Sequence, residues 1–265
     1  MRIAVVAPSC PLKREAAEAV AAMAEARGDC ELVIHPQSFS SDGHFAGPDA
    51  ERLAALREVM SDPAIDAVWF ARGGYGSNRI AEAAAGALPA KARDKVYLGY
   101  SDGGFLLAAL HGAGCRVAHG PMPQDVAREG GEAAVGRALD WLVRGDGAAV
   151  EAGLGGPAFA FNLTVLSCLL GTAIEPDFTA RELLVEELDE QHYRIDRLMF
   201  HLAGSERVRR CRGIRLGRCQ VPENDRPFGS NEEAIVRDWC GRSGIAFLGR
   251  ADIGHDAANK VVPFF

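Results

Sequence analysis

Short apolar runs alternate with longer amphipathic segments along the first half of the chain. The runs have strand length and lie at residues 3–7, 31–35, 65–70, 96–98 and 117–119. The longer segments carry apolar side chains at helical spacing and lie at residues 13–27, 49–60, 78–87 and 103–110. Continuous apolar strands separated by helices predict a parallel sheet with right-handed crossovers.

The second half alternates less regularly. Strands are predicted at residues 183–188, 214–216 and 245–248, and helices at 132–143, 162–170, 192–202 and 231–240. The glycine-rich stretch at 145–157 is typical of a connection. We therefore predict an α/β protein with an N-terminal, parallel-sheet, Rossmann-like domain at 1–145, a linker at 146–161 and a smaller C-terminal α+β domain at 162–265.

The composition of the chain disfavours nucleic acids and membranes as partners. The chain has 265 residues, of which 48% are hydrophobic and 25% charged, as in ordinary globular proteins. Its net charge is -7, so no overall positive field favours nucleic acid, and the basic stretch at 207–218 is interpreted as a solvated face. No apolar stretch approaches membrane-spanning length and the N-terminal apolar run is too short for a signal peptide. We expect no nucleic-acid or membrane partner.

The cysteines indicate a reducing compartment. There are seven, an odd number, widely scattered and without a C-x-x-C pair. This pattern disfavours both a disulfide framework and a structural zinc site. The sequence therefore predicts a cytoplasmic protein, and we expect neither a metal nor an organic cofactor.

One stretch places a serine between a strand and a helix. Gly99-Tyr100-Ser101-Asp102-Gly103 fits the pattern G-x-S-x-G, which is typical of a sharp turn that exposes a serine hydroxyl. The glycines allow strand and helix to approach closely, and the helix N-terminus offers unpaired N–H groups to a developing anion. An ordinary βα turn fits the same five residues.

A second glycine-rich loop, Arg72-Gly73-Gly74-Tyr75-Gly76-Ser77, follows the strand at 65–70. Ligands of parallel sheets bind beyond the carboxyl ends of the strands. Because this loop and the Ser101 turn both lie at such ends, we expect them to face one crevice.

A nucleophilic serine requires a base and a group that orients the base. The candidate histidines are His35, His111, His119, His192, His201 and His255. His255 differs from the others because it lies in a glycine-rich loop after a short strand, where functional residues gather, although an exposed loop histidine remains the alternative.

Two candidates for the orienting acid, Glu186 and Glu187, lie in an otherwise apolar strand. Side chains alternate across a strand, so one of the two must face the buried side or the cleft. A carboxylate there needs a hydrogen-bond partner, for example an imidazole N–H.

Together these segments resemble the LD-carboxypeptidases, the serine peptidases also called muramoyltetrapeptide carboxypeptidases. The opening Val6-Ala7-Pro8-Ser9 is similar to the family's first strand and turn. Five further matches follow in order: Arg72-Gly73-Gly74-Tyr75-Gly76, Gly99-Tyr100-Ser101-Asp102, Asn162-Leu163-Thr164 with Leu170-Gly171-Thr172, Glu186 followed by Tyr193-Arg194-Ile195-Asp196-Arg197, and Gly254-His255.

The resemblance implies a Ser-Glu-His triad. Ser101 corresponds to the nucleophile, His255 to the base and Glu186 to the orienting glutamate. The backbone N–H groups of Gly74 and Asp102 correspond to the oxyanion hole. The implied site closes between the two halves of the chain.

The implied reaction is release of the terminal D-alanine from a cytosolic murein tetrapeptide, free or sugar-linked, during peptidoglycan recycling. Candidates for anchoring the substrate are Arg72, Tyr75, Asn162 and Arg197. The resemblance also leaves open that the protein forms a homodimer. The alternatives are a microcin-immunity-type serine peptidase on the same fold and a non-catalytic ligand-binding module.

Two local departures from the family pattern occur within the chain. Gly103-Gly104 follows the nucleophile where Ile-Thr is usual, and Ala160-Phe161 precedes Asn162 where many members have two glycines. The chain is also shorter than most members, which raises the possibility of altered substrate choice or dimer contacts. None of these departures touches the triad.

Overall fold

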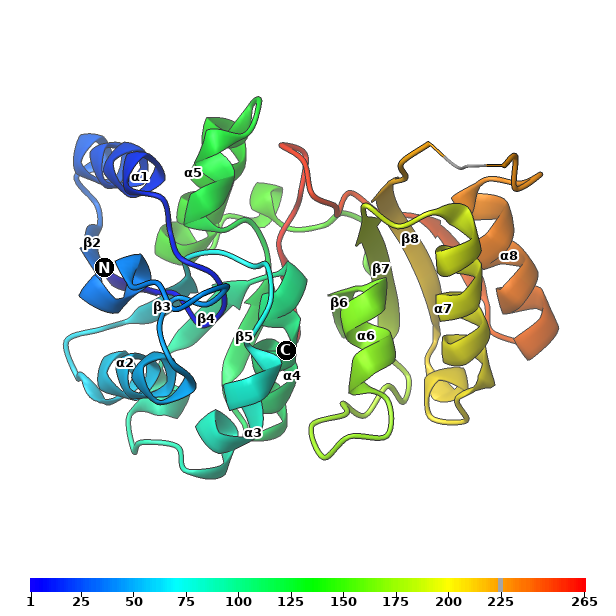
Figure 1. Ribbon diagram of the computed structural model, residues 1–265, viewed down its shortest axis with the longest axis horizontal. Coiled ribbons are helices and arrows are strands. Elements are labelled where there is room, and N and C mark those ends of the chain that lie inside the picture. Colours follow the sequence, from blue (N-terminus) through cyan, green and yellow to red (C-terminus); the bar gives the residue numbers. More distant parts are fainter. Residues whose placement is uncertain (224–225) are drawn as a thin grey trace.

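The computed structural model describes residues 1–223 and 226–265, and in this part of the chain two sheets lie side by side (Figure 1). The strands of the first sheet are β1 (Arg2–Val6), β2 (Glu31–Ile34), β3 (Ala67–Phe70), β4 (Val96–Gly99), β5 (Arg116–His119) and β10 (Val262–Pro263). Those of the second sheet are β6 (Ala158–Asn162), β7 (Glu182–Leu188), β8 (Gly213–Gln220) and β9 (Phe247–Arg250).

Helices connect most of these strands. The α-helices are α1 (Arg14–Arg27), α2 (Asp49–Ser61), α3 (Asn78–Gly86), α4 (Gly104–Gly112), α5 (Gly131–Arg144), α6 (Leu163–Leu169), α7 (His192–Gly204) and α8 (Glu232–Ser243). Short 3₁₀ turns are η1 (Pro36–Phe39), η2 (Ala92–Asp94), η3 (Ser101–Gly103), η4 (Pro123–Ala127), η5 (Gly147–Ala149) and η6 (Val208–Arg210). No helix in the described residues combines the length and apolar character needed to cross a membrane.

The first sheet has the strand order β10-β5-β4-β3-β1-β2 and is parallel except for β10. Side chains of β1 alternate between its faces, as strand geometry requires. Ile3 and Val5 pack with α1 and α5, whereas Ala4 and Val6 pack with α2, α3 and α4 on the other face (Figure 1). The predicted parallel α/β sheet is confirmed, and its strands end on the side where the Ser101 turn begins.

The second sheet, in the order β6-β7-β8-β9, is also parallel. Helices α6, α7 and α8 alternate with its strands, so this half is α/β rather than the α+β arrangement expected from its irregular pattern. The difference arises at β6, which occupies Ala158–Asn162 and therefore includes residues predicted as linker. This strand is buried on both faces and alternates Ala with Phe.

The last residues of the chain return to the first sheet. Strand β10 pairs antiparallel with β5 beside the centre of the molecule (Figure 1). The segment before β10 is hydrogen-bonded to residues 149–151, which belong to the other connection between the two sheets. Glu151 N–H donates to Val261 O at 2.9 Å, and Val261 N–H donates to Ala149 O at 3.0 Å. The two crossings thus form one paired strap.

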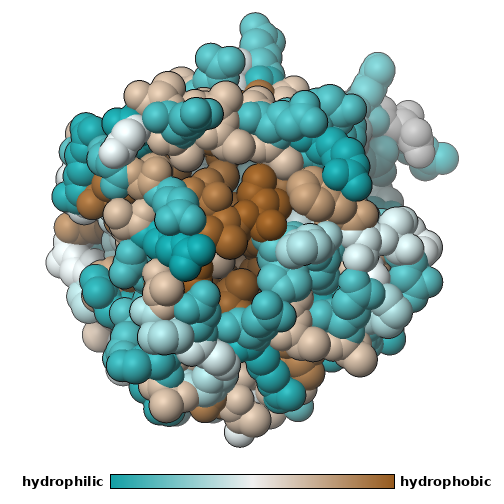
Figure 2. Space-filling model, turned by 90° about the vertical axis from the view of Figure 1, so that its left-hand side faces the viewer, coloured by the Kyte–Doolittle hydropathy of each residue, from teal (hydrophilic) through white to brown (hydrophobic). Residues whose placement is uncertain are grey.

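The opposite edge of the first sheet is β2. Its residues Leu32, Val33 and Ile34 are only partly buried. Figure 2 shows the face of the molecule on this side, where hydrophobic side chains gather near the centre and hydrophilic ones surround them.

Candidate active site

The turn after β4 holds Ser101 in a strained conformation. Its φ is +56°, in the left-handed region that residues with a Cβ rarely adopt. The turn needs its glycines because Phe70 of β3 lies against it. A Cβ on Gly99 would lie 2.5 Å from Phe70 Cδ2, and one on Gly103 would lie 3.1 Å from the same atom. The two glycines of the G-x-S-x-G pattern therefore make room for the Phe70 side chain of the neighbouring strand.

The loop after β3 lies directly against this turn. A Cβ on Gly73 would be 2.9 Å from Ser101 Cβ and 3.0 Å from Ser101 Oγ. Gly74 has φ +104°, and a Cβ there would overlap Cys10 Sγ. Among the described residues, neither the Gly74 N–H nor the Asp102 N–H has a hydrogen-bond acceptor. The two loops therefore meet as expected, and each of them contains a backbone N–H without an acceptor among the described residues.

The Asp102 carboxylate holds the Ser101 turn and the glycine loop together through hydrogen bonds. Its Oδ2 accepts from Ser9 Oγ at 2.5 Å and from Ser77 N–H at 2.8 Å, while Ser77 Oγ donates to Asp102 O at 2.5 Å. Arg52, which is fully buried, donates to Pro8 O and to Gly76 O. The turn after β1, the glycine loop and the nucleophile turn are thereby tied together.

Glu186 and His255 form a buried pair. His255 Nδ1 donates to Glu186 Oε2 at 2.7 Å, and the two residues are 5% and 0% exposed. Burial opposes the imidazolium, but the charge and hydrogen bond of Glu186 outweigh it and raise the pKa of His255 above its ordinary value. His255 Nε2 has no partner among the described residues. Its lone pair is therefore available to take a proton.

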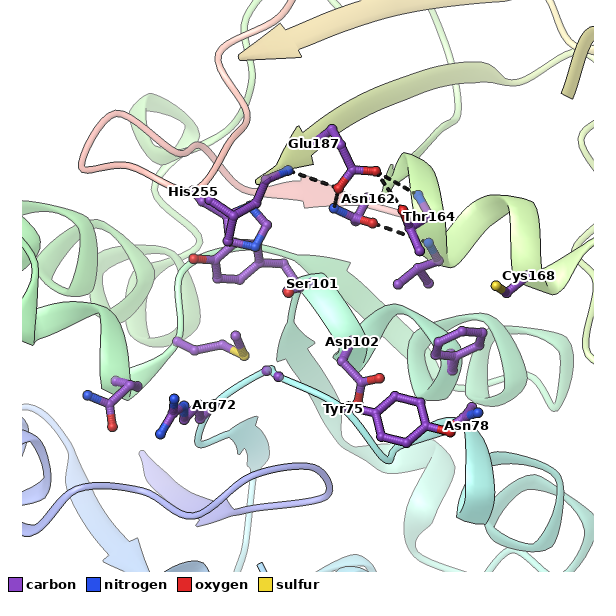
Figure 3. Close-up of a pocket in the computed structure, with 18 of the residues that line it drawn as sticks. Arg72, Tyr75, Asn78, Ser101, Asp102, Asn162, Thr164, Cys168, Glu187 and His255 are labelled. Atoms are coloured by element: carbon purple, nitrogen blue, oxygen red, sulfur yellow. Dashed lines mark hydrogen bonds between the residues drawn. The ribbon is translucent and has the colours of Figure 1, made fainter. Parts of the chain in front are cut away.

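His255 and Ser101 line the same cavity and lie close together in Figure 3, from opposite halves of the chain. No hydrogen bond joins them within the described part of the chain. Catalytic hydrogen bonds are commonly long before substrate is bound. The Glu186–His255 pair is thus formed in the described structure, and Ser101 lies in the same cavity.

Glu187 has a different role from its neighbour. Its Oε1 accepts from Asn162 Nδ2 at 2.5 Å, and its Oε2 accepts from Thr164 N–H at 3.0 Å and Thr164 Oγ1 at 2.8 Å (Figure 3). Burial raises its pKa, although these bonds favour the carboxylate. The alternation of side chains along a strand required only one of the two glutamates to face the interior. Both are buried, because β7 is an inner strand that is covered on both faces.

The cavity has a volume of about 830 Å³, within the range of small-molecule sites. Arg72, Tyr75 and Asn162 line it, as do Lys13 and Gln124, which the sequence did not single out. Arg197 is not among the lining residues. It lies on the exposed side of α7 beside the Tyr193 ring, because Ile195 and Met199 of that helix face the core.

None of the other candidate histidines, all of which are described residues, lines this cavity. His35 Nε2 contacts Glu58, and His111 packs on Phe159. His201 contacts Ser167 at the protein surface. His119 is buried near His255, and burial lowers its pKa to about 4, so it stays neutral. In the described residues no group of three or more His, Cys, Asp or Glu side chains is arranged to hold a metal.

Sequence reasoning missed a polar cluster beside Glu186 and His255, in which Tyr100 and Asp125 are buried and the Arg128 side chain is 38% exposed. Tyr100 OH donates to Asp125 Oδ1 at 2.8 Å, and Arg128 Nη1 donates to Tyr100 OH at 3.0 Å and to His255 O at 2.5 Å. The available signal was position: Asp125 and Arg128 follow the carboxyl end of β5, the same sheet edge as Ser101.

Comparisons with known proteins agree with this architecture. Sequence models of the LD-carboxypeptidase N-terminal and C-terminal domains match residues 3–120 and 155–264. The murein tetrapeptide carboxypeptidase of Pseudomonas aeruginosa is 28% identical over 286 residues, which are 99% of this chain and 91% of that protein.

Two solved structures share the fold. A muramoyltetrapeptide carboxypeptidase from Oxalobacter formigenes has a TM-score of 0.83 at 23% identity and covers 100% of this chain and 92% of its own. MccF in complex with glutamyl sulfamoyl guanosine has a TM-score of 0.81 at 17% identity, covering 99% and 90%.

Proposed function

The chain belongs to the LD-carboxypeptidase family and is a serine carboxypeptidase, and on that premise we propose that it releases the terminal D-alanine of murein tetrapeptides. Ser101 is the proposed nucleophile, His255 the base and Glu186 the group that orients the base. The observation that carries the proposal is the buried Glu186–His255 hydrogen bond of 2.7 Å, with an unpartnered Nε2 in the cavity of Ser101.

In the proposed mechanism His255 Nε2 takes the Ser101 proton as Oγ attacks the carbonyl that precedes D-alanine. Glu186 stabilises the imidazolium that forms. The N–H groups of Gly74 and Asp102 receive the negative charge of the tetrahedral intermediate. His255 then gives its proton to the departing amine, and water activated by the same base hydrolyses the acyl-enzyme.

The substrate enters a cavity with charges of both signs. Arg72 and Lys13 line it, and so do Glu82 and Glu190. We infer that Arg72, Tyr75 and Asn162 contact the peptide, since all three line the cavity that contains Ser101. Arg197 lies outside this cavity and is not part of the proposal.

We also place the reaction in cytoplasmic recycling of wall peptides, free or sugar-linked. All seven cysteines are free thiols, as is usual in a reducing compartment. The partly exposed apolar edge at β2 is the surface on which we would test for a homodimer, by measuring molar mass in solution.

The function is tested by incubating the protein with an L,D-tetrapeptide that ends in D-alanine. We expect D-alanine release, measured with a coupled D-amino acid oxidase assay. The matched control substrate ends in L-alanine and should be stable, because inversion at the alanine Cα exchanges the directions of its methyl group and its carboxylate relative to the scissile bond. Absence of release from the D-terminated peptide across several buffers would contradict the proposal.

A second candidate substrate is tested in the same assay format. Tyr75 lines the cavity and its side chain is 46% exposed, so its ring offers a face on which a nucleobase can stack. Cleavage of an aminoacyl sulfamoyl nucleoside, the kind of ligand bound in the MccF structure, would favour the microcin-immunity type of peptidase. Cleavage of the tetrapeptide alone favours the carboxypeptidase.

The oxyanion assignment gives a separate prediction. Gly74→Ala adds a methyl group that overlaps Cys10 Sγ at a φ of +104°, so the Gly74 N–H must move. We expect kcat to fall on the order of 10²–10³-fold, the effect of losing one oxyanion donor. Steady-state kinetics on the tetrapeptide measure it.

The matched control is Gly28→Ala. Gly28 also has positive φ, +68°, but it ends α1 away from the cavity, and a Cβ there meets no atom within 4 Å. This variant should lose about 1 kcal/mol of stability from backbone strain and keep its kcat. If Gly74→Ala also kept its kcat, the N–H of Gly74 would not be an oxyanion donor.

A further inference from the structure

The side chain of Arg128 spans the two halves of the site. Arg128 follows η4 on the first-sheet side, and its Nη1 makes two hydrogen bonds. One goes to Tyr100 OH at 3.0 Å, and Tyr100 is the residue before Ser101. The other goes to His255 O at 2.5 Å, in the loop between β9 and β10. A single nitrogen therefore connects the turn of the nucleophile with the loop of the base.

The groups that accept from Arg128 Nη1 are held in place by further contacts. Tyr100 is 1% exposed, its OH donates to Asp125 Oδ1, and Asp125 Oδ2 accepts from Met122 N–H at 2.8 Å. The Tyr100 and His255 rings lie in contact, with centroids 4.9 Å apart. Moving Arg128 would therefore release both the Tyr100 hydroxyl and the main chain that carries the imidazole.

We propose that Arg128 is a positioning residue for the reaction, which sets the distance between the Ser101 turn and the His255 imidazole through Tyr100 OH and His255 O. The inference rests on the proposed roles of Ser101 and His255. It assigns Arg128 no contact with the reacting atoms. A misplacement of about 1 Å in such a pair can cost on the order of 10²-fold in rate.

The charge of Arg128 gives the proposal a second, electrostatic signature. The ionisable groups that face His255 are Glu186 on β7, Asp125 and Arg128 at η4, Tyr100 after β4 and His119 on β5. Burial and Arg128 both lower the pKa of His255, while Glu186 and Asp125 raise it. Removing the guanidinium therefore raises the pKa of His255, and the acid limb of activity moves to higher pH, because the base must be neutral.

The chain offers a matched control in Arg137 of α5. Its Nη1 also donates to two main-chain carbonyls of the same loop, Ala257 O at 3.0 Å and Asn259 O at 2.8 Å. Arg137 contacts neither Tyr100 nor the carbonyl of His255. Arg128→Met and Arg137→Met thus each remove a guanidinium that donates two hydrogen bonds. Only Arg128→Met removes the hydrogen bond to Tyr100 OH and with it the link to the Ser101 turn.

The experiment compares wild type, Arg128→Met, Arg128→Lys and Arg137→Met. We expect Arg128→Met to lower kcat on the order of 10–100-fold with KM within about threefold, and to raise the pKa of His255 in an NMR titration. Arg128→Lys should keep the wild-type titration, since it keeps the charge, but not the full kcat. Arg137→Met should lower only the melting temperature.

Three results would overturn the proposal. A rise in KM at constant kcat in Arg128→Met would make Arg128 a substrate contact. Equal behaviour of Arg128→Met and Arg137→Met would make it purely structural. If Arg128→Met does not fold, Arg128→Lys decides the question, and full wild-type kcat in that variant would reject the role.

The test also separates this inference from the proposed function. The rate at which a fluorophosphonate modifies Ser101 needs no peptide, and it should fall in Arg128→Met and not in Arg137→Met. If wild type modifies readily but releases no D-alanine, the substrate proposal fails while the positioning role stands. If all four proteins react with the probe at one rate, the positioning role fails by itself.

Discussion

Ser101→Ala should abolish D-alanine release, with kcat lower on the order of 10⁴–10⁶-fold, because it removes the proposed nucleophile, the hydroxyl that shares the cavity with His255 and lies against the loop of Gly73. Binding should persist, since the variant keeps the cavity wall. Isothermal titration with the tetrapeptide measures binding, and a discontinuous D-alanine assay measures the residual rate. Wild-type turnover in this variant would remove Ser101 from the mechanism.

Ser101→Gly is the companion variant and should be equally inactive. At a φ of +56° a Cβ is unfavourable, and alanine retains that Cβ whereas glycine does not. We expect Ser101→Gly to be about 1 kcal/mol more stable than Ser101→Ala in urea unfolding. Equal stabilities would show that the turn does not hold the serine under strain.

Glu186→Gln should be the second severe variant, with kcat lower on the order of 10³–10⁴-fold. The carboxylate accepts from His255 Nδ1 at 2.7 Å, and an amide can instead present its NH₂ group to that nitrogen. The proton then shifts to Nε2, which can no longer accept from Ser101. Glu186 also raises the pKa of His255 against burial, so the residual activity should extend to lower pH.

Glu187→Gln is the control for the neighbouring charge on the same strand. Its carboxylate bonds Asn162 and Thr164, not His255. The acid limb of its kcat/KM profile should stay where it is in wild type, whatever happens to KM. If the acid limb of the pH profile moved equally in Glu186→Gln and Glu187→Gln, the combined charge of the strand, and not the Glu186 hydrogen bond, would determine the protonation of His255.

The first half of the fold was predictable because its signals are strong. Its central strands are short apolar runs buried on both faces, and its helices end at residues such as Gly28. The second half was harder. Strand β6 follows several glycines and was assigned to the linker, and β10 spans only Val262–Pro263, too short for any periodicity. Pairing with β5, which only the folded chain reveals, makes it a strand.

The site shows the same division. The serine turn and the glycine loop could be placed at one sheet edge from their positions after strands. Spacing along the chain could not decide which of the six candidate histidines lies beside an orienting acid, because His255 contacts Glu186 from a sequence distance of 69 residues. The Tyr100–Asp125–Arg128 cluster was missed since hydrogen bonds between separate loops leave no periodic signal.

The two local departures expected from the family pattern lie in contact. A Cβ on Gly104 would lie 3.0 Å from Val165 Cγ1 and 3.1 Å from Phe161 Cδ1. Gly104 at the start of α4 therefore leaves room for the large Phe161 side chain on β6. The two positions are far apart along the chain, and only the folded structure brings them together.

The paired strap of residues 149–151 and 261 is not the only link between the two halves of the chain. Its two segments are bonded to each other at 2.9 and 3.0 Å. Phe161 of β6 also belongs to the same buried cluster as Phe105 of α4, so the two sheets share one hydrophobic core. Rotating one sheet against the other would have to open that core as well as the strap, at a cost in buried apolar area. We therefore expect Ser101 and His255 to keep their relative positions when a peptide enters the cavity.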